Sequence, residues 1–277
     1  MASPAAPGLG SILLHLDATP ASAVRLAVAR ELAERHGGTV TALFGASGDD
    51  DPRYAYSAGA ALDGALGAGW REEAAANLQR ASGRPPLPGE RWFHVAGDSI
   101  VHGFLAEAAY ADLLVLGQQP PGARGGAPAG FVDSVILESG RPALVLPSAA
   151  RAQVPGRRVL VAWNASPQSA RALASARVLL AQAEAVHVAV WSRHPAAAPF
   201  SRIDIVEYLR RHGIEATLHR QAHVAHVGPA IREMAKALDI DLVVMGCFGR
   251  SRASEWMLGG TTRWVLQQMP VPLLMAH

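Results

Sequence analysis

The sequence predicts an α/β protein made of two tandem Rossmann-like or flavodoxin-like domains, each a five-stranded parallel sheet with helices on both faces. Two observations predict this fold. Apolar runs typical of buried parallel strands alternate with helical segments, and the pattern occurs twice within the 277 residues. Composition agrees, because 50% of the residues are hydrophobic and 17% are charged, as in a well-packed globular protein.

The first repeat match lies at the start of each half. Residues 12–22 (ILLHLDATPAS) align with residues 159–169 (VLVAWNASPQS) at an offset of 159 − 12 = 147. Each segment is an apolar strand followed by Asp or Asn, then a hydroxyl residue and proline. We therefore expect Thr19 and Ser166 to be helix N-caps, with the prolines at the first helical position.

The second repeat match lies near the end of each half. Residues 112–117 (DLLVLG) fall on 241–246 (DLVVMG), and Gly130 falls on Gly259, at an offset of 241 − 112 = 129. The offset drops by 147 − 129 = 18, so the first half carries about that much extra chain. We place it in the Gly- and Ala-rich residues 47–69.

The second half gives the clearest sequence of elements. Strands are expected near residues 157–163, 185–191, 215–221, 241–246 and 271–276, and helices near 167–183, 199–213, 227–239 and 256–269. The linker at 147–156 (PSAARAQVPG) separates domains at 1–148 and 149–277. The last strands, 142–146 and 272–276, are expected at sheet edges.

A glycine-rich segment follows the fourth strand of the second half. Ligands of such sheets bind outside the carboxyl ends of the strands, where Asn164 and Gly246 are expected. Glycine lets the main chain approach a phosphate, and a helix N-terminus favours an anion. Residues 246–261 therefore predict a phosphate cradle, although not a P-loop, which needs a lysine. The alternative is that these glycines only form tight turns.

The pattern Gly246-x2-Gly249-x9-Gly259 after a fourth strand resembles the ATP-binding members of the universal stress protein family. The resemblance covers nearly the whole chain as two copies, and tandem forms are common in that family. It implies a non-catalytic ATP-binding protein with a role in the stress response. ATP, with or without Mg, would be held by the second domain.

The resemblance also assigns the binding residues by position. They are Asn164, Val190, Trp191, Gly246, Gly249, Arg250, Gly259, Gly260 and Thr261. Val190 and Trp191 match positions that contact the base through the main chain, and Arg250 either donates to phosphate or keeps a surface loop soluble. The family usually has Asp where Asn164 stands, and Ser or Thr directly after the last glycine, where Gly260 stands.

The first half lacks parts of this cradle. Pro120 stands where the second half has Gly249, and proline has no N–H to offer a phosphate. Phe131 and Val132 replace the Gly260–Thr261 pair. We therefore expect the first half to bind no nucleotide in this way.

Several classes of function are disfavoured. A net charge of +2 is too small for a nucleic-acid binder, and no apolar run is long enough to cross a bilayer. The N-terminus does not read as a signal peptide, and one cysteine, Cys247, fits a reducing, cytoplasmic setting. Cys247 is expected to be a small buried side chain, with a redox-responsive thiol as the alternative.

No catalytic residues or metal ligands stand out. No paired carboxylates, and no nucleophile with a base, can be placed, and the cluster of His219, His223 and His226 lacks the ligands of a metal site. The rival functions are a nucleotide-independent interaction or chaperone-like module and, less favoured, a slow ATPase. The resemblance implies pairing through the last strand, hence an internal pseudo-dimer of the two halves, with a homodimer as a further state.

Overall fold

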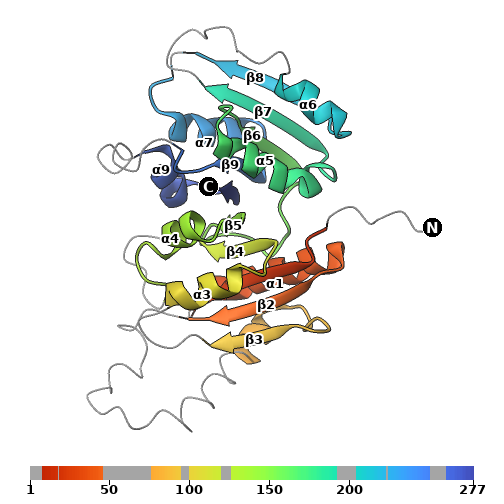
Figure 1. Ribbon diagram of the computed structural model, residues 1–277, viewed down its shortest axis with the longest axis vertical. Coiled ribbons are helices and arrows are strands. Elements are labelled where there is room, and N and C mark those ends of the chain that lie inside the picture. Colours follow the sequence, from red (N-terminus) through yellow and green to blue (C-terminus); the bar gives the residue numbers. More distant parts are fainter. Residues whose placement is uncertain are drawn as a thin grey trace, which may run out of the picture. The chain divides into compact units, whose positions relative to one another are not determined.

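The computed structural model describes residues 8–17, 19–45, 76–94, 100–119, 126–191, 204–222, 224–249 and 260–277 (Figure 1). The chain divides by its contacts into two units. Unit 1 comprises Met1–Arg141 and Leu146–Val154, and unit 2 comprises Pro142–Val145 and Pro155–His277. Each unit is described by itself.

Unit 1 alternates strands and helices. Its elements are β1 (Ser11–Leu16), α1 (Ala21–His36), β2 (Thr39–Phe44), β3 (Arg91–His94), α3 (Ile100–Ala108), β4 (Leu113–Gly117) and α4 (Phe131–Glu138). β1 pairs in parallel with β2 and with β4, and β2 pairs in parallel with β3. α1 ends because Gly37 takes a left-handed conformation, with φ 65°, and its N–H closes the last turn.

Unit 2 repeats this order. Its elements are β6 (Arg158–Ala162), α5 (Pro167–Leu180), β7 (Ala185–Trp191), α6 (Ile205–Arg211), β8 (Thr217–Gln221), α7 (Val227–Ala237), β9 (Leu242–Gly246), α9 (Thr261–Gln268) and β10 (Leu273–Ala276). All four neighbouring pairs of these strands are parallel. Residues 143–145 of β5 (Ala143–Leu146) group with unit 2, where they pair antiparallel with β10.

The strand order identifies the fold of each half. It is β3-β2-β1-β4-β5 in the first half and β8-β7-β6-β9-β10 in the second. This third-second-first-fourth order is the Rossmann order and differs from that of flavodoxin. The expectation of two tandem Rossmann-like domains, each with a five-stranded sheet and helices on both faces, is confirmed (Figure 1). The order reverses between β1 and β4 and between β6 and β9, where such sheets open a crevice.

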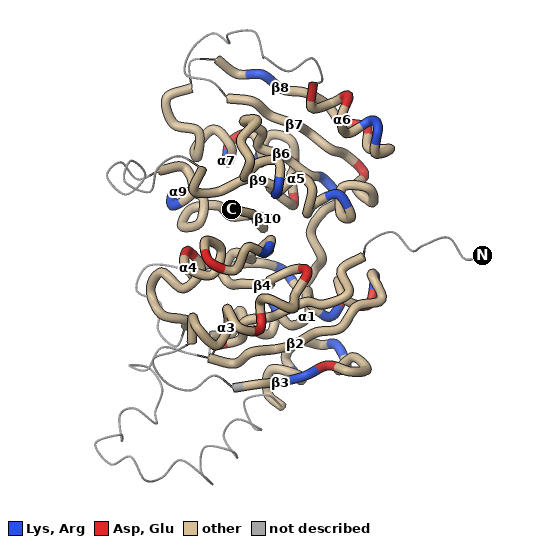
Figure 2. Tube along the Cα trace, in the orientation of Figure 1, with Lys and Arg blue, Asp and Glu red and all other residues tan. Residues whose placement is uncertain are grey.

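Burial follows the expected pattern of doubly covered strands. β1, β4, β9 and β10 are almost wholly buried and carry no Lys, Arg, Asp or Glu. In the view of Figure 2, most charged residues lie on helices and outer strands, and acidic and basic side chains are mixed along α6. No helix in the described ranges is both long and apolar enough to cross a membrane.

Some boundaries differ from those expected. Ser166 caps α5 and Pro167 is its first residue, as expected. The expectation that Thr19 caps α1 is wrong: the N-cap is Pro20, and the Thr19 hydroxyl donates to Asp17 instead. α6 ends at Arg211 and α9 at Gln268, earlier than expected, and residues 199–203 and 256–259 of the expected helices lie outside the described residues. The extra chain placed at 47–69 lies outside the described residues.

Candidate functional site

The site expected in unit 2 begins where β6 and β9 end side by side. Ala162 pairs with Met245, so the residues that follow, Asn164 and Gly246, leave the same edge of the sheet. Asn164 is exposed, and its Oδ1 accepts a hydrogen bond from the backbone N–H of Ser166 at 3.1 Å. Ala165 between them has φ 57°, a conformation that few non-glycine residues adopt outside tight turns.

Gly246 has a structural reason to be glycine. A Cβ atom built there would lie 2.3 Å from the backbone N of Ser169 and 2.5 Å from the carbonyl carbon of Gln168. The first turn of α5 therefore packs directly onto the end of β9, and any side chain would force the two apart. This packing accounts for Gly246 whether or not a ligand binds.

The loop after β9 is anchored on two sides. The N–H of Cys247 donates to Ala276 O at 3.0 Å, and the N–H of Phe248 donates to the Thr262 hydroxyl at 3.2 Å. Phe248 has φ 53°, a conformation rare for a bulky residue and found mostly where the surroundings enforce it. The loop thus holds a strained backbone between β10 and the start of α9, and the exposed Gly249 follows it.

Close to Gly249 lies a side chain that the sequence did not single out. A Cβ atom at Gly249 would stand 3.2 Å from Oε1 of Gln168 and 3.9 Å from the Ser166 hydroxyl. Gln168 Oε1 is buried and has no hydrogen-bond partner within the described ranges. Because Gly249 has no side chain, the Gln168 carboxamide lies close to the space that a side chain at residue 249 would fill.

Beside this loop α9 begins. Its N-cap, Gly260, makes no side-chain cap bond, so the first N–H groups of the helix have no cap from that residue. The Thr262 side chain is buried and its hydroxyl is taken by Phe248, whereas Thr261 is partly exposed. An exposed helix start of this kind favours an anion. Arg250 and Gly259, also expected here, lie outside the described residues.

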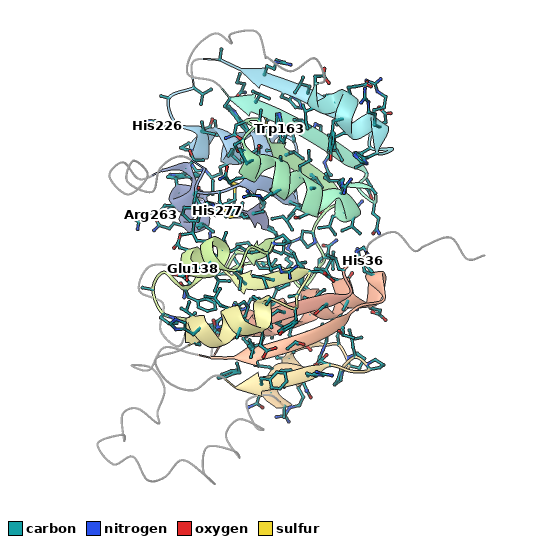
Figure 3. All side chains as sticks on the ribbon, viewed as in Figure 1. His36, Glu138, Trp163, His226, Arg263 and His277 are labelled. Atoms are coloured by element: carbon teal, nitrogen blue, oxygen red, sulfur yellow. The ribbon has the colours of Figure 1, made fainter. Side chains whose placement is uncertain are left out.

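The residues expected near a base lie at the end of β7. Val190 and Trp191 are half-buried, and Ala189 pairs with Ala162 of β6, which brings this strand end beside Asn164. Trp191 Nε1 donates to Gln221 Oε1 at 2.8 Å, which fixes the indole against β8. Trp163 follows β6 directly, and Figure 3 labels it together with His226, the residue before α7.

The matching place in unit 1 is filled by an ion pair. Asp17 follows β1 and is 5% exposed, and Arg25 Nη2 lies 2.8 Å from its Oδ1. The Ser22 hydroxyl also donates to Asp17 Oδ1 at 2.8 Å. A Cβ atom at Gly117 would stand 2.3 Å from Arg25 Nη1, so this glycine makes room for the guanidinium. Burial alone would raise the pKa of Asp17, but Arg25, His15 and the Thr19 and Ser22 hydroxyls together lower it.

His15 completes this buried cluster. Its Nε2 lies 2.9 Å from Gly45 O, and its ring packs 4.5 Å from Phe131 and 6.1 Å from Phe104, measured between centroids. Since a carbonyl only accepts, Nε2 carries a proton in this hydrogen bond. Burial lowers the pKa of His15 to about 4. Phe131, expected to replace part of the cradle, is therefore a core residue of unit 1.

The other candidates stand apart from this site. Cys247 is 1% exposed, which confirms a small buried side chain. His219 Nε2 lies 3.1 Å from His187 Nδ1, whereas His223 lies beyond β8 and outside the described residues. Among the residues described, no three His, Cys, Asp or Glu side chains come together as metal ligands would. A hollow of about 300 Å³ lies elsewhere, between β8 and α7, beside His219, Gln221 and Glu233.

Comparison with known sequences places the second half in a family. Residues 156–277 match the family described as the universal stress protein family. Universal stress proteins from Mycobacterium bovis and Mycobacterium tuberculosis are 33% identical over 86 residues, which is 30% of this chain. The match spans only 28% of the length of these relatives.

Solved structures resemble the chain over nearly its whole length. A universal stress protein from Archaeoglobus fulgidus superimposes with a TM-score of 0.65 at 16% identity, over 96% of this chain and 97% of its own. A putative universal stress protein from Pseudomonas aeruginosa gives 0.57 at 19% identity, over 97% and 93%. At such identities the likeness shows the fold.

Proposed function

We propose that this chain, which belongs to the universal stress protein family through residues 156–277, binds an adenine nucleotide in unit 2 and acts in a stress response without catalysing a reaction. One observation carries the proposal. The strained loop at Phe248 is tied to the start of α9 by the Thr262 hydroxyl, so exposed Gly249 and the helix start at Gly260 lie at the same edge of unit 2. Such an edge suits a phosphate chain.

The proposed contacts are divided between the two ends of the nucleotide. The phosphates lie against the helix start and the glycine loop, and the base lies against the ends of β6 and β7. The residues involved are Asn164, Val190, Trp191, Gly246, Gly249, Arg250, Gly259, Gly260 and Thr261. ATP is the ligand that the resemblance favours, and a Mg ion would accompany its phosphates.

Other features of the proposal concern the whole chain. The domains are 1–148 and 149–277, the first is a scaffold with no nucleotide of its own, and the protein is cytoplasmic. Support for pairing through the last strand comes from residues 143–145, which pair antiparallel with β10 inside unit 2. We propose an internal pseudo-dimer built on this pairing, with a homodimer as a further state. ATP hydrolysis would rest on positioning alone and would be slow.

Equilibrium dialysis with Mg-ATP tests the nucleotide proposal. The test variant is Gly259→Asp, and the matched control is Gly130→Asp at the equivalent position of the first half. A carboxylate among phosphates repels them, so Gly259→Asp should weaken binding by about a hundred-fold or more. The control should bind like the parent. Phosphate release that survives Gly259→Asp would point to a contaminating ATPase.

A second candidate is a nucleotide-independent interaction module. Two observations favour it: Gly246 is explained by its contact with α5, and Asn164 already accepts a hydrogen bond from Ser166. Absence of ATP binding by the parent protein in the dialysis experiment would overturn the nucleotide proposal and leave this module as the better reading.

A further inference from the structure

The side-chain oxygen Oε1 of the half-buried Gln168 is buried beside Gly249 and has no hydrogen-bond partner among the residues that the structure describes. Gln168 is the second residue of α5, after Pro167, and its main chain packs onto Gly246. Its Oε1 would lie 3.2 Å from a Cβ atom at Gly249, in the gap between the helix and the loop. Buried polar atoms in folded proteins nearly always have a hydrogen-bond partner, so this one requires an explanation.

Several described polar groups of this region already have hydrogen-bond partners. The Ser166 hydroxyl accepts from the Ser169 N–H at 3.1 Å and lies 3.3 Å from the Ser169 hydroxyl, as a helix cap does. Phe248 N–H is bonded to Thr262, and Asn164 Oδ1 to Ser166. In the part of the chain that the structure describes, Gln168 Oε1 has no partner. A ligand bound beside Gly249 can supply one.

The repeat gives independent support. Position 168 corresponds to Ala21 in the first half (168 − 147 = 21), and position 249 corresponds to Pro120 (249 − 129 = 120). The carboxamide is therefore present in the half that keeps the glycine and absent from the half that lost it. Both α1 and α5 form, although only α5 has glutamine at this position. Helix formation alone therefore does not explain why Gln168 occurs in the same half as Gly249.

We propose that Gln168 is a ligand-binding residue whose carboxamide contacts a phosphate of the bound nucleotide, an inference that rests on the proposed function. Phosphate oxygens only accept hydrogen bonds, so the amide presents Nε2 to them. A half-turn about the last side-chain torsion exchanges Nε2 and Oε1, which have nearly the same size. The shape of the packed side chain is unchanged by this rotation, and Gly249 remains in contact with it.

Binding of ATP and of adenosine to the parent, to two variants of Gln168 and to one control variant tests the inference. Gln168→Met keeps the length of the side chain but removes the hydrogen bond, and Gln168→Glu keeps the shape but places a negative charge against the phosphates. We expect Gln168→Met to weaken ATP binding by about ten-fold. Gln168→Glu should weaken it further, whereas adenosine, which has no phosphate, should bind equally to both variants. Ala21→Gln in unit 1 is the matched control and should bind like the parent.

The outcomes separate the two proposals. If the parent binds no ATP, the proposed function fails and this inference fails with it. If the parent binds ATP and both variants bind it equally well, the function stands and Gln168 is not a contact. If Gln168→Met and Gln168→Glu weaken the binding of ATP and of adenosine to the same extent, Gln168 only supports the loop, and the phosphate contact is again overturned. Melting curves of each variant confirm that it is folded.

Discussion

The ends of β1 and β6 are built from matching sequence and are filled in different ways. Asp17 after β1 is buried and pairs with Arg25, which reaches it from α1. Asn164 after β6 is exposed, and the position on α5 that corresponds to Arg25 is Ala172 (25 + 147 = 172). The Arg25 guanidinium thus fills the end of the first strand, whereas the matching position on α5 carries only a methyl group.

The glycines at the ends of β4 and β9 are each explained by a packing contact. Gly117 and Gly246 occupy the same repeat position, and a side chain at either would collide with a neighbouring group unless that group moved. At Gly117 the obstacle is Arg25, and at Gly246 it is the backbone of α5. Retention of a glycine at this position therefore does not report a ligand, since each has its own packing reason. The distinction between the units lies in the helix residue opposite the glycine.

The largest expected effect is on the stability of unit 1. Arg25→Ala leaves the Asp17 carboxylate buried without its counter-charge, and breaking a buried pair in this way costs about 3–5 kcal/mol. Hydrogen exchange at the amides of β1 and β4 measures the loss within unit 1. Arg35→Ala on the same helix is the matched control, because its side chain is 48% exposed and its pair with Glu31 should contribute little. Equal protection in both variants would contradict the assigned role of Arg25.

A somewhat smaller effect is expected from pH, again in unit 1. Folding lowers the pKa of His15 from 6.5 to about 4, so the unfolded state takes up a proton at a pH where the folded state does not. The stabilisation is complete above pH 6.5 and is lost as the pH falls to about 4. The loss amounts to about 3 kcal/mol.

Denaturation at a series of pH values checks this expectation. His15→Leu should flatten the dependence across that window, because the other histidines are common to both proteins. Asp17 also has a lowered pKa, but its contribution is lost only below its usual 3.8, so the two groups act in separate ranges. An unchanged slope in His15→Leu would mean that His15 is not the group responsible.

The fold could be predicted from the sequence because it depends on short-range patterns. The apolar runs, such as residues 241–246, mark strands that are covered on both faces, and β9 is found at Leu242–Gly246. The repeat then predicts that both halves share one topology. Ser166 and Pro167 have the local chemistry of a helix start, and that start is observed.

The content of each crevice could not be foreseen in the same way. Nothing in the local sequence links Arg25 to Asp17 and Gly117, which are brought together only by the packing of α1 on the sheet. Thr19 was expected to cap the helix, but its hydroxyl turns to the buried Asp17 because that carboxylate needs donors. Gln168 belongs to no sequence motif that would single it out. Direct comparison of the repeats at position 21 is the signal that would have found it.

Transfer of the unit 1 pair into unit 2 gives the most specific test of the comparison. Ala172 belongs to α5, is fully buried, and stands at the repeat position of Arg25. Asn164→Asp supplies the carboxylate, which keeps the new charge from being buried unpaired. The double variant Ala172→Arg/Asn164→Asp should bind ATP about a hundred-fold more weakly, because the guanidinium would occupy the strand end that the nucleotide needs.

Two controls define the result of this transfer. Asn164→Asp with Ala174→Arg adds the same groups, but residue 174 is exposed on the same helix, so any loss of affinity in this control comes from Asn164→Asp and not from a guanidinium at the strand end. Hydrogen exchange of α5 shows whether the double variant remains folded, since overpacking of a core helix is itself destabilising. If the folded double variant binds ATP like the parent, the residue at position 172 is not what distinguishes the end of β6 from the end of β1.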